Sequence, residues 1–146
     1  MEYNLNFSFK IKKLQINLGG NYAYTQSLNY GDTLVWGGDS YGKQLPYIPV
    51  HSGNIFVSFK LKGYFINYTH NSYSERFTTS SNDISKRDWL YPYFMNNLNL
   101  GKDFSIKKMK FSVQFKIYNL FNEEYRSVLG RPMPGRNYLL TLSFRF

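Results

Sequence analysis

The sequence predicts an all-β fold, an antiparallel meander of about seven strands that forms a curved open sheet. Apolar and polar residues alternate with a period of two in many segments, which places alternate side chains on opposite faces of a strand. Aromatic residues, mostly Tyr and Phe, make up 20% of the chain, and these residues favour strands. No apolar run approaches the roughly 18 residues that a membrane-spanning helix requires.

The C-terminal segment shows the alternation most clearly. One face of this predicted strand carries Tyr138, Leu140, Leu142, Phe144 and Phe146. The other face carries Asn137, Leu139, Thr141, Ser143 and Arg145. The same criterion predicts strands over residues 3–11, 14–25, 54–60, 64–76, 89–100, 109–118 and 137–146.

The connections between these strands alternate in length. Short links are predicted at 11–13, 61–63 and 101–108, and long links at 27–52, 78–88 and 122–136. Outer-membrane β-barrels have this layout, with short periplasmic turns and long extracellular loops. We therefore predict a partial transmembrane β-barrel whose last strand descends to the periplasmic side. Because the strand count is odd and the first strand also descends, earlier strands of the barrel are expected to be missing.

The charges in the most regular strands indicate which face meets lipid. A cation on the lipid face at mid-membrane costs roughly 2–4 kcal/mol. The cations of these strands all fall on the polar side: Lys10, Lys60, Lys110, Lys116 and Arg145. Two alternatives stay open at this stage. One is a soluble, lipocalin-like ligand-binding barrel that buries its apolar face, and the other is a small complete outer-membrane barrel with an eighth strand.

Composition argues against several other functions. The absence of cysteine excludes disulfides and zinc-thiolate sites, and the two histidines, His51 and His70, have no acidic partners at metal-ligand spacing. No catalytic triad, carboxylate pair or phosphate loop can be assembled, so we expect no enzyme activity, cofactor or metal. The net charge is +9, but the cations are dispersed, so no nucleic acid is expected as a partner. The N-terminus has no features of a signal peptide.

Two segments near the C-terminus carry a family resemblance. Residues 118–125 are YNLFNEEY and residues 130–138 are GRPMPGRNY. They resemble the end of TonB-dependent receptors, in which an Asn-Leu-Phe-Asn segment with a Tyr shortly after leaves the penultimate strand. A Gly-Arg-Pro-type loop then leads into a final strand ending in Phe. Residues 45–51, LPYIPVH, also resemble a family segment that enters a descending strand.

The resemblance implies a barrel of about 22 strands that is closed by an N-terminal plug domain and takes up a scarce ligand, such as a siderophore, with energy delivered through TonB. Residues 1–146 would then be one C-terminal barrel segment, the last seven strands, without a plug domain. The implied partners are the bilayer, lipopolysaccharide, the remaining strands and the plug, with TonB reached only through the plug. The implied location is the bacterial outer membrane.

Binding residues concentrate on loops that a rigid scaffold carries. Loop residues that could contact an aromatic or anionic ligand are Tyr30, Trp36, Tyr41, Tyr47, Arg126, Arg131 and Arg136. Alternatively, these side chains pack the loops together or meet lipopolysaccharide phosphates. Tyr138, Phe144 and Phe146 resemble the C-terminal signal that the outer-membrane assembly machinery reads. The alternative is a last strand that simply ends on an apolar residue.

Overall fold

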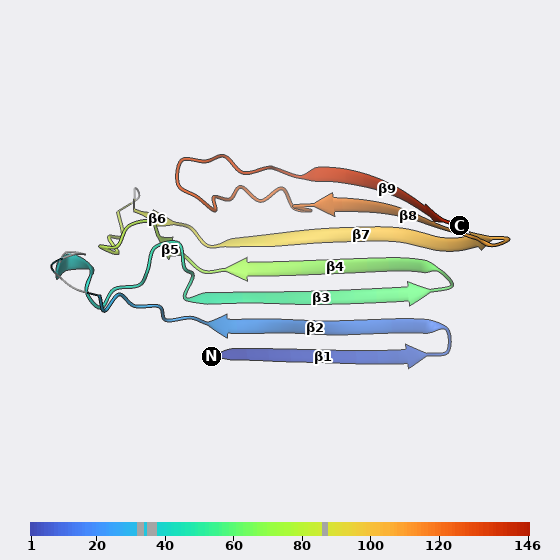
Figure 1. The fold of residues 1–146 in the computed structure, drawn as a ribbon, viewed down its shortest axis with the longest axis horizontal. Coiled ribbons are helices and arrows are strands. Elements are labelled where there is room, and N and C mark those ends of the chain that lie inside the picture. Colours follow the sequence, from blue (N-terminus) through green and yellow to red (C-terminus); the bar gives the residue numbers. More distant parts are fainter. Residues whose placement is uncertain (32–33, 35–37, 86–87) are drawn as a thin grey trace.

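The structure is a computed structural model that describes residues 1–31, 34, 38–85 and 88–146. Its main element is a seven-stranded antiparallel sheet in which neighbours along the chain are also neighbours in space (Figure 1). This arrangement confirms the predicted all-β meander. The strands of this sheet are β1 (Glu2–Ile11), β2 (Leu14–Tyr24), β3 (His51–Leu61), β4 (Tyr64–Tyr73), β7 (Tyr93–Ile106), β8 (Met109–Tyr118) and β9 (Asn137–Arg145).

The connection between β4 and β7 differs from the predicted pattern. The segment 64–76 does not form one strand, because β4 ends at Tyr73 and Arg76 belongs to the short strand β5 (Arg76–Phe77). The predicted strand 89–100 is also divided. Its first residues form β6 (Trp89–Leu90), which pairs with β5 in a separate two-stranded sheet. Pro92, which has no backbone N–H for a ladder, lies between β6 and β7.

The short connections lie at one end of the sheet and the long ones at the other, as Figure 1 shows. The N-terminus lies at the loop end and the C-terminus at the turn end. Each short turn contains a lysine with a left-handed backbone: Lys12 (φ 55°), Lys62 (φ 50°) and Lys107 (φ 54°). The prediction of a turn over 101–108 was too long, because β7 continues to Ile106.

Strand pairing keeps the two faces separate across the whole sheet. One row of paired residues is Phe9, Ile16, Phe59, Ile66, Leu100, Phe115 and Leu140. The row beside it is Ser8, Asn17, Ser58, Asn67, Asn99, Lys116 and Leu139, which is polar except for Leu139 on the edge strand β9. We call the face of the first row the apolar face and the face of the second row the polar face. Since directly paired residues share a face, the sequence alternation is preserved in register from β1 to β9.

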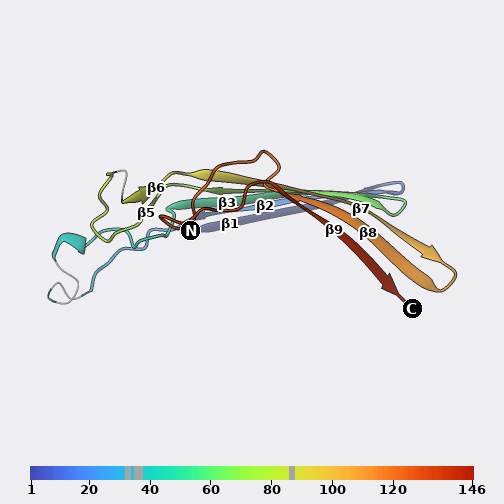
Figure 2. The ribbon, with the colours of Figure 1, turned by 90° about the horizontal axis from the view of Figure 1, so that it is seen from above.

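Figure 2 shows a single curved layer rather than a closed barrel. Among the described residues, Leu90 and Tyr93 are the only buried apolar side chains. The accessible surface is 10716 Å², whereas a compact protein of this mass has about 7,800 Å². A soluble barrel requires a closed dry interior, which this sheet does not form. A complete small barrel would require an eighth strand, and the described part of the main sheet has seven.

No helix in the described ranges is both long and apolar enough to cross a membrane.

Two glycines on the polar face leave room for aromatic rings from the neighbouring strands. A Cβ atom added at Gly19 would overlap the ring of Phe56, and one added at Gly101 would overlap the ring of Phe65. Glycine is normally unfavourable within a strand because it adds no side chain to the packing. Here an aromatic ring from the neighbouring strand covers the glycine backbone. Gly101 therefore belongs inside β7 and does not mark a turn.

Candidate ligand-binding loops

The loop that follows β8 is held by two asparagines with left-handed backbones, Asn119 (φ 53°) and Asn122 (φ 56°). Asn119 is 1% exposed. Its side-chain oxygen accepts from the Glu123 backbone N–H at 2.7 Å, and its Nδ2 donates to the Glu123 carbonyl at 2.9 Å. The Asn122 side chain accepts from the Arg136 backbone N–H at 2.9 Å. The Asn-Leu-Phe-Asn motif thus fixes the path from β8 to β9.

A buried arginine joins the two long connections that flank β7 and β8. Arg76 in β5 is 5% exposed, and its Nη2 donates to the Arg126 carbonyl at 2.9 Å. Its guanidinium lies 4.8 Å from the centre of the Tyr93 ring, a cation–π distance. Tyr73 and Tyr125 flank Tyr93, each with ring centres 5.0 Å away. The Arg76 Nε is buried without a hydrogen-bond partner.

Next to this cluster, β6 and the β8–β9 connection enclose a cavity of about 350 Å³, which we call the loop pocket. The pocket is lined by Trp89, Leu90, Tyr91, Glu124, Arg126 and Leu129. The ring centres of Trp89 and Tyr91 lie 4.6 Å apart, and Leu90 is 2% exposed. The lining combines apolar surface with a cation and a carboxylate, which is the usual composition of a small-molecule site. Sequence reasoning missed most of these residues because loops have no periodicity to follow.

Ligand contact by the aromatic residues of the first long connection stays a prediction. Tyr30 and Tyr41 pack edge to face with ring centres 5.4 Å apart, and both are largely exposed. Tyr47 has a left-handed backbone (φ 62°) and donates its N–H to the Phe77 carbonyl at 2.7 Å. This bond ties the first connection to β5. Trp36 lies outside the described residues.

The predicted arginines of the last connection occupy different places. Arg126 lines the loop pocket. Arg131 is exposed and donates its backbone N–H to the Val128 carbonyl at 3.3 Å. Arg136 is also exposed and reaches the Leu120 carbonyl at 3.5 Å. Within the described ranges, Arg126 is therefore the only predicted ligand contact in the lining of the loop pocket.

The polar face carries a second set of polar groups closer to the turn end. Lys60 forms an ion pair with Asp103 at 3.0 Å, and Ser112 donates to the same carboxylate at 2.8 Å. Lys60 and Asp103 border an open hollow of about 320 Å³. Its other lining residues are mostly amides and hydroxyls, namely Gln15, Asn17, Ser58, Asn67, Asn99 and Gln114, together with Phe65. Such a lining suits water or another polar protein surface rather than an apolar ligand.

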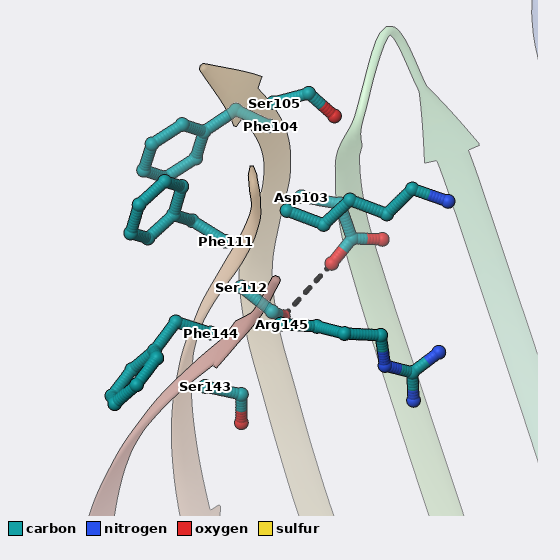
Figure 3. A pocket seen from close by; sticks show the side chains of 9 residues that line it. Asp103, Phe104, Ser105, Phe111, Ser112, Ser143, Phe144 and Arg145 are labelled. Carbon is teal, nitrogen blue, oxygen red and sulfur yellow. Dashed lines mark hydrogen bonds between the residues drawn. The ribbon is translucent and has the colours of Figure 1, made fainter. Parts of the chain in front are cut away.

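A hollow of about 410 Å³ at the turn end of β7, β8 and β9 shows the separation of the two faces directly. In Figure 3, Phe104, Phe111 and Phe144 point to one side of the strands and the polar lining residues point to the other. These side chains diverge and do not converge on a common ligand. Nearby, the Phe144 and Phe146 rings meet edge to face at 5.7 Å, and both are exposed.

The proposed assembly signal thus lies on the last strand, at an edge of the sheet. Tyr138 is 59% exposed and stacks on Phe115 at 6.0 Å. It shares the apolar face with Phe144. Whether assembly factors read these rings stays a prediction.

The two histidines lie on the apolar face rather than at a metal site. His51 Nδ1 lies 2.7 Å from the Tyr22 hydroxyl, and His70 Nδ1 lies 2.8 Å from the Asn96 side-chain oxygen. In the part of the chain that the structure describes, no group of three or more His, Cys, Asp and Glu residues is placed to hold a metal ion.

These features define a class of protein: an open segment of a β-barrel with two chemically distinct faces, turns at one end and ligand-sized loops at the other. A family model for the TonB dependent receptor-like β-barrel matches residues 1–120, and the chain belongs to this family. Its members are receptors and transporters rather than enzymes. The match ends inside the Asn-Leu-Phe-Asn motif, so β9 lies beyond it.

Solved structures of the same family have the same fold. BauA, the ferric preacinetobactin receptor from Acinetobacter baumannii, matches with a TM-score of 0.74 and 13% identity, over 98% of this chain and 22% of that chain. The unliganded ferric citrate transporter FecA matches with a TM-score of 0.70 and 16% identity, over 91% of this chain and 21% of that chain. The chain therefore spans about a fifth of these structures. No curated protein sequence matches.

Proposed function

We propose that the chain is the C-terminal barrel segment of an outer-membrane receptor that takes up a scarce ligand such as a ferric siderophore. The observation that carries the proposal is the separation of a mainly apolar face from a mainly polar face across seven strands. In a bilayer the apolar face meets hydrocarbon and the polar face lines the lumen. The short turns then lie in the periplasm and the loop pocket lies outside the cell.

The partners follow from the two unpaired edges of the sheet. An open sheet edge in hydrocarbon leaves backbone groups without hydrogen bonds, each at a cost of several kcal/mol. We therefore propose that β1 and β9 pair with the remaining strands of a receptor barrel, and that a plug domain occupies the polar face. TonB would act through that plug. The assembly machinery would receive the chain at β9.

The loop pocket is the proposed ligand contact within this chain. A ferric chelate is often anionic and carries flat organic groups, so the Trp89 and Tyr91 rings and the Arg126 guanidinium are suited to it. The iron-chelate ligands in the names of BauA and FecA support this ligand class. Glu124 adds an acceptor for amide or hydroxyl donors.

Iron uptake by cells that carry the chain in its native gene context tests the proposal. The probes are ⁵⁵Fe-labelled ferric citrate and ferric preacinetobactin, with an uncoupler of the proton gradient as a second condition. We expect energy-dependent uptake of at least one probe, and about a tenfold weaker apparent affinity after W89A or R126A. The control K108A changes a residue at the turn end and should have no effect. Unchanged uptake after deletion of the gene would contradict a role in the uptake of these chelates.

A further inference from the structure

The apolar face is interrupted in one region by polar residues. Strand register places His51, His70, Ser72 and Asn96 on this face, at the loop end of β3, β4 and β7. The remaining non-aromatic polar residue of this face, Lys102, lies near the turn end, where its Nζ donates to the Tyr64 hydroxyl at 2.8 Å. Polar groups that face a membrane carry a cost and frequently mark functional sites. Their clustering on adjacent strands therefore calls for a partner.

Two members of this cluster, His70 and Asn96, have hydrogen-bond partners within the sheet. The Asn96 side-chain oxygen accepts from the Tyr68 hydroxyl at 2.6 Å and lies 2.8 Å from His70 Nδ1. Asn96 is 7% exposed. The Phe94 ring stacks on His70 with ring centres 6.1 Å apart and covers the cluster toward the loop end. These groups need no external ligand.

The other two members, His51 and Ser72, border a notch of about 300 Å³ at the loop end of β2, β3, β4 and β7. From the apolar face the notch is lined by Tyr22, His51, Ser72 and Phe94, and from the chain beyond the strands by Ser74 and Glu75. The Tyr22 hydroxyl lies at 2.7 Å from His51 Nδ1, which leaves Nε2 as the second hydrogen-bonding atom of the imidazole. Within the described ranges, the Ser72 hydroxyl has only a long hydrogen bond, 3.4 Å, to the Gly53 carbonyl.

The chemistry of the lining favours a neutral polyol over a phosphate. Among the described residues, the lining contains hydroxyls, an imidazole and the Glu75 carboxylate, but neither lysine nor arginine. A phosphate group would meet the negative charge of Glu75 without a strong cation to offset it. A sugar ring offers hydroxyls to these donors and acceptors, and its C–H groups can pack on Tyr22 and Phe94. Because the notch lies at the margin of the lipid-facing surface, its occupant comes from the outer leaflet.

We propose that this notch binds an unphosphorylated sugar in the headgroup of a glycolipid of the outer leaflet. The inference rests on the proposed membrane placement of the chain, and it goes beyond ligand uptake. A headgroup held between Tyr22 and Phe94 would fix one glycolipid against β3 and β4 while its acyl chains lie along the apolar face below.

Native mass spectrometry of the protein extracted from outer membranes, with the chain in its native gene context, tests this proposal. The probes are lipopolysaccharide, phosphatidylethanolamine and the soluble core saccharide without acyl chains. We expect one lipopolysaccharide to bind about tenfold more tightly than phosphatidylethanolamine. The variant S72L fills the notch with an apolar side chain that suits a lipid-facing position, and it should abolish this preference. The control V113L adds similar bulk to the apolar face on β8 and should retain it.

The outcomes separate this proposal from the proposed function. Equal binding of the two lipids, or an unchanged preference in S72L, would overturn the glycolipid site while leaving receptor function intact. Binding of the soluble saccharide as tightly as lipopolysaccharide would overturn the assignment to a lipid. Failure of the protein to fractionate with outer membranes would reject both proposals. A heat-dependent shift in gel mobility checks that each variant is folded.

Discussion

Replacing Asn119 with alanine tests whether the Asn-Leu-Phe-Asn motif stabilises the connection between β8 and β9. The change removes both side-chain hydrogen bonds to Glu123, at 2.7 and 2.9 Å, from a residue that is 1% exposed. Each such bond contributes about 1 kcal/mol. Alanine must also adopt the left-handed backbone (φ 53°), which costs roughly 1–2 kcal/mol. We therefore expect the free energy of unfolding to fall by about 3 kcal/mol.

Two further variants divide this loss into its causes. Asn119→Gly removes the same hydrogen bonds but tolerates the left-handed backbone, so it should cost about 2 kcal/mol. Asn122→Ala loses one bond, to the Arg136 backbone N–H at 2.9 Å, and residue 122 is exposed. Its cost should therefore be smaller than that of N119A. Urea titration of the protein in lipid vesicles, followed by tryptophan fluorescence, measures all three. A loss below about 1 kcal/mol for N119A, or a larger loss for N119G, would refute the reasoning.

Three other predictions concern the rest of the sheet. R76A removes the cation that joins the two long connections, and we expect faster trypsin cleavage within residues 119–136, measured by mass spectrometry; unchanged cleavage would argue against this link. G101A places a methyl group against the Phe65 ring and should cost about 1–3 kcal/mol, part of which F65L should restore; a neutral G101A would contradict the packing. The Lys60 and Asp103 side chains are 49% and 43% exposed. K60A should therefore change the unfolding free energy by at most about 1 kcal/mol. A larger loss would show that water is excluded from this part of the polar face.

The strand faces could be predicted from sequence because a period of two is a strong and local signal. Phe111, Val113 and Phe115 alternate with polar residues in the chain, and the structure pairs them with Phe144, Leu142 and Leu140. A register shift of one residue would bring apolar side chains opposite polar ones along the whole strand. The apolar pattern therefore determined strand pairing as well as orientation.

The predicted strand bounds were wrong where a local sequence feature reflected a contact with a distant segment of the chain. Gly101 suggested a turn, but it lies within β7 because the Phe65 ring needs space there. The segment after Trp89 suggested one strand, but β6 pairs with β5 instead. Neither the Phe65 contact nor the β5–β6 pairing can be read from a single segment, because each depends on residues brought together by folding.

The candidate site was predictable only in part. Arg126 was identified as a loop cation, whereas Trp89, Tyr91 and Glu124 were not identified as its neighbours. The loop pocket lies between the β4–β7 and β8–β9 connections, which the hydrogen bond from Arg76 to the Arg126 carbonyl joins. Arg76 and Arg126 are 50 residues apart in sequence, and no periodic pattern relates them. Positions on strands therefore followed from sequence, while the convergence of loops required the structure.

Labelling of single cysteines at positions 141 and 142 tests the central claim most directly, because these neighbours on β9 lie on opposite faces of the sheet. Thr141 pairs with Gln114 on the polar face, and Leu142 pairs with Val113 on the apolar face. In outer membranes that contain the chain in its native gene context, a lipophilic maleimide should label T141C poorly and L142C well. A water-borne maleimide should show the reverse preference. Water-borne labelling of L142C together with lipophilic labelling of T141C would contradict the membrane orientation on which the proposed function depends.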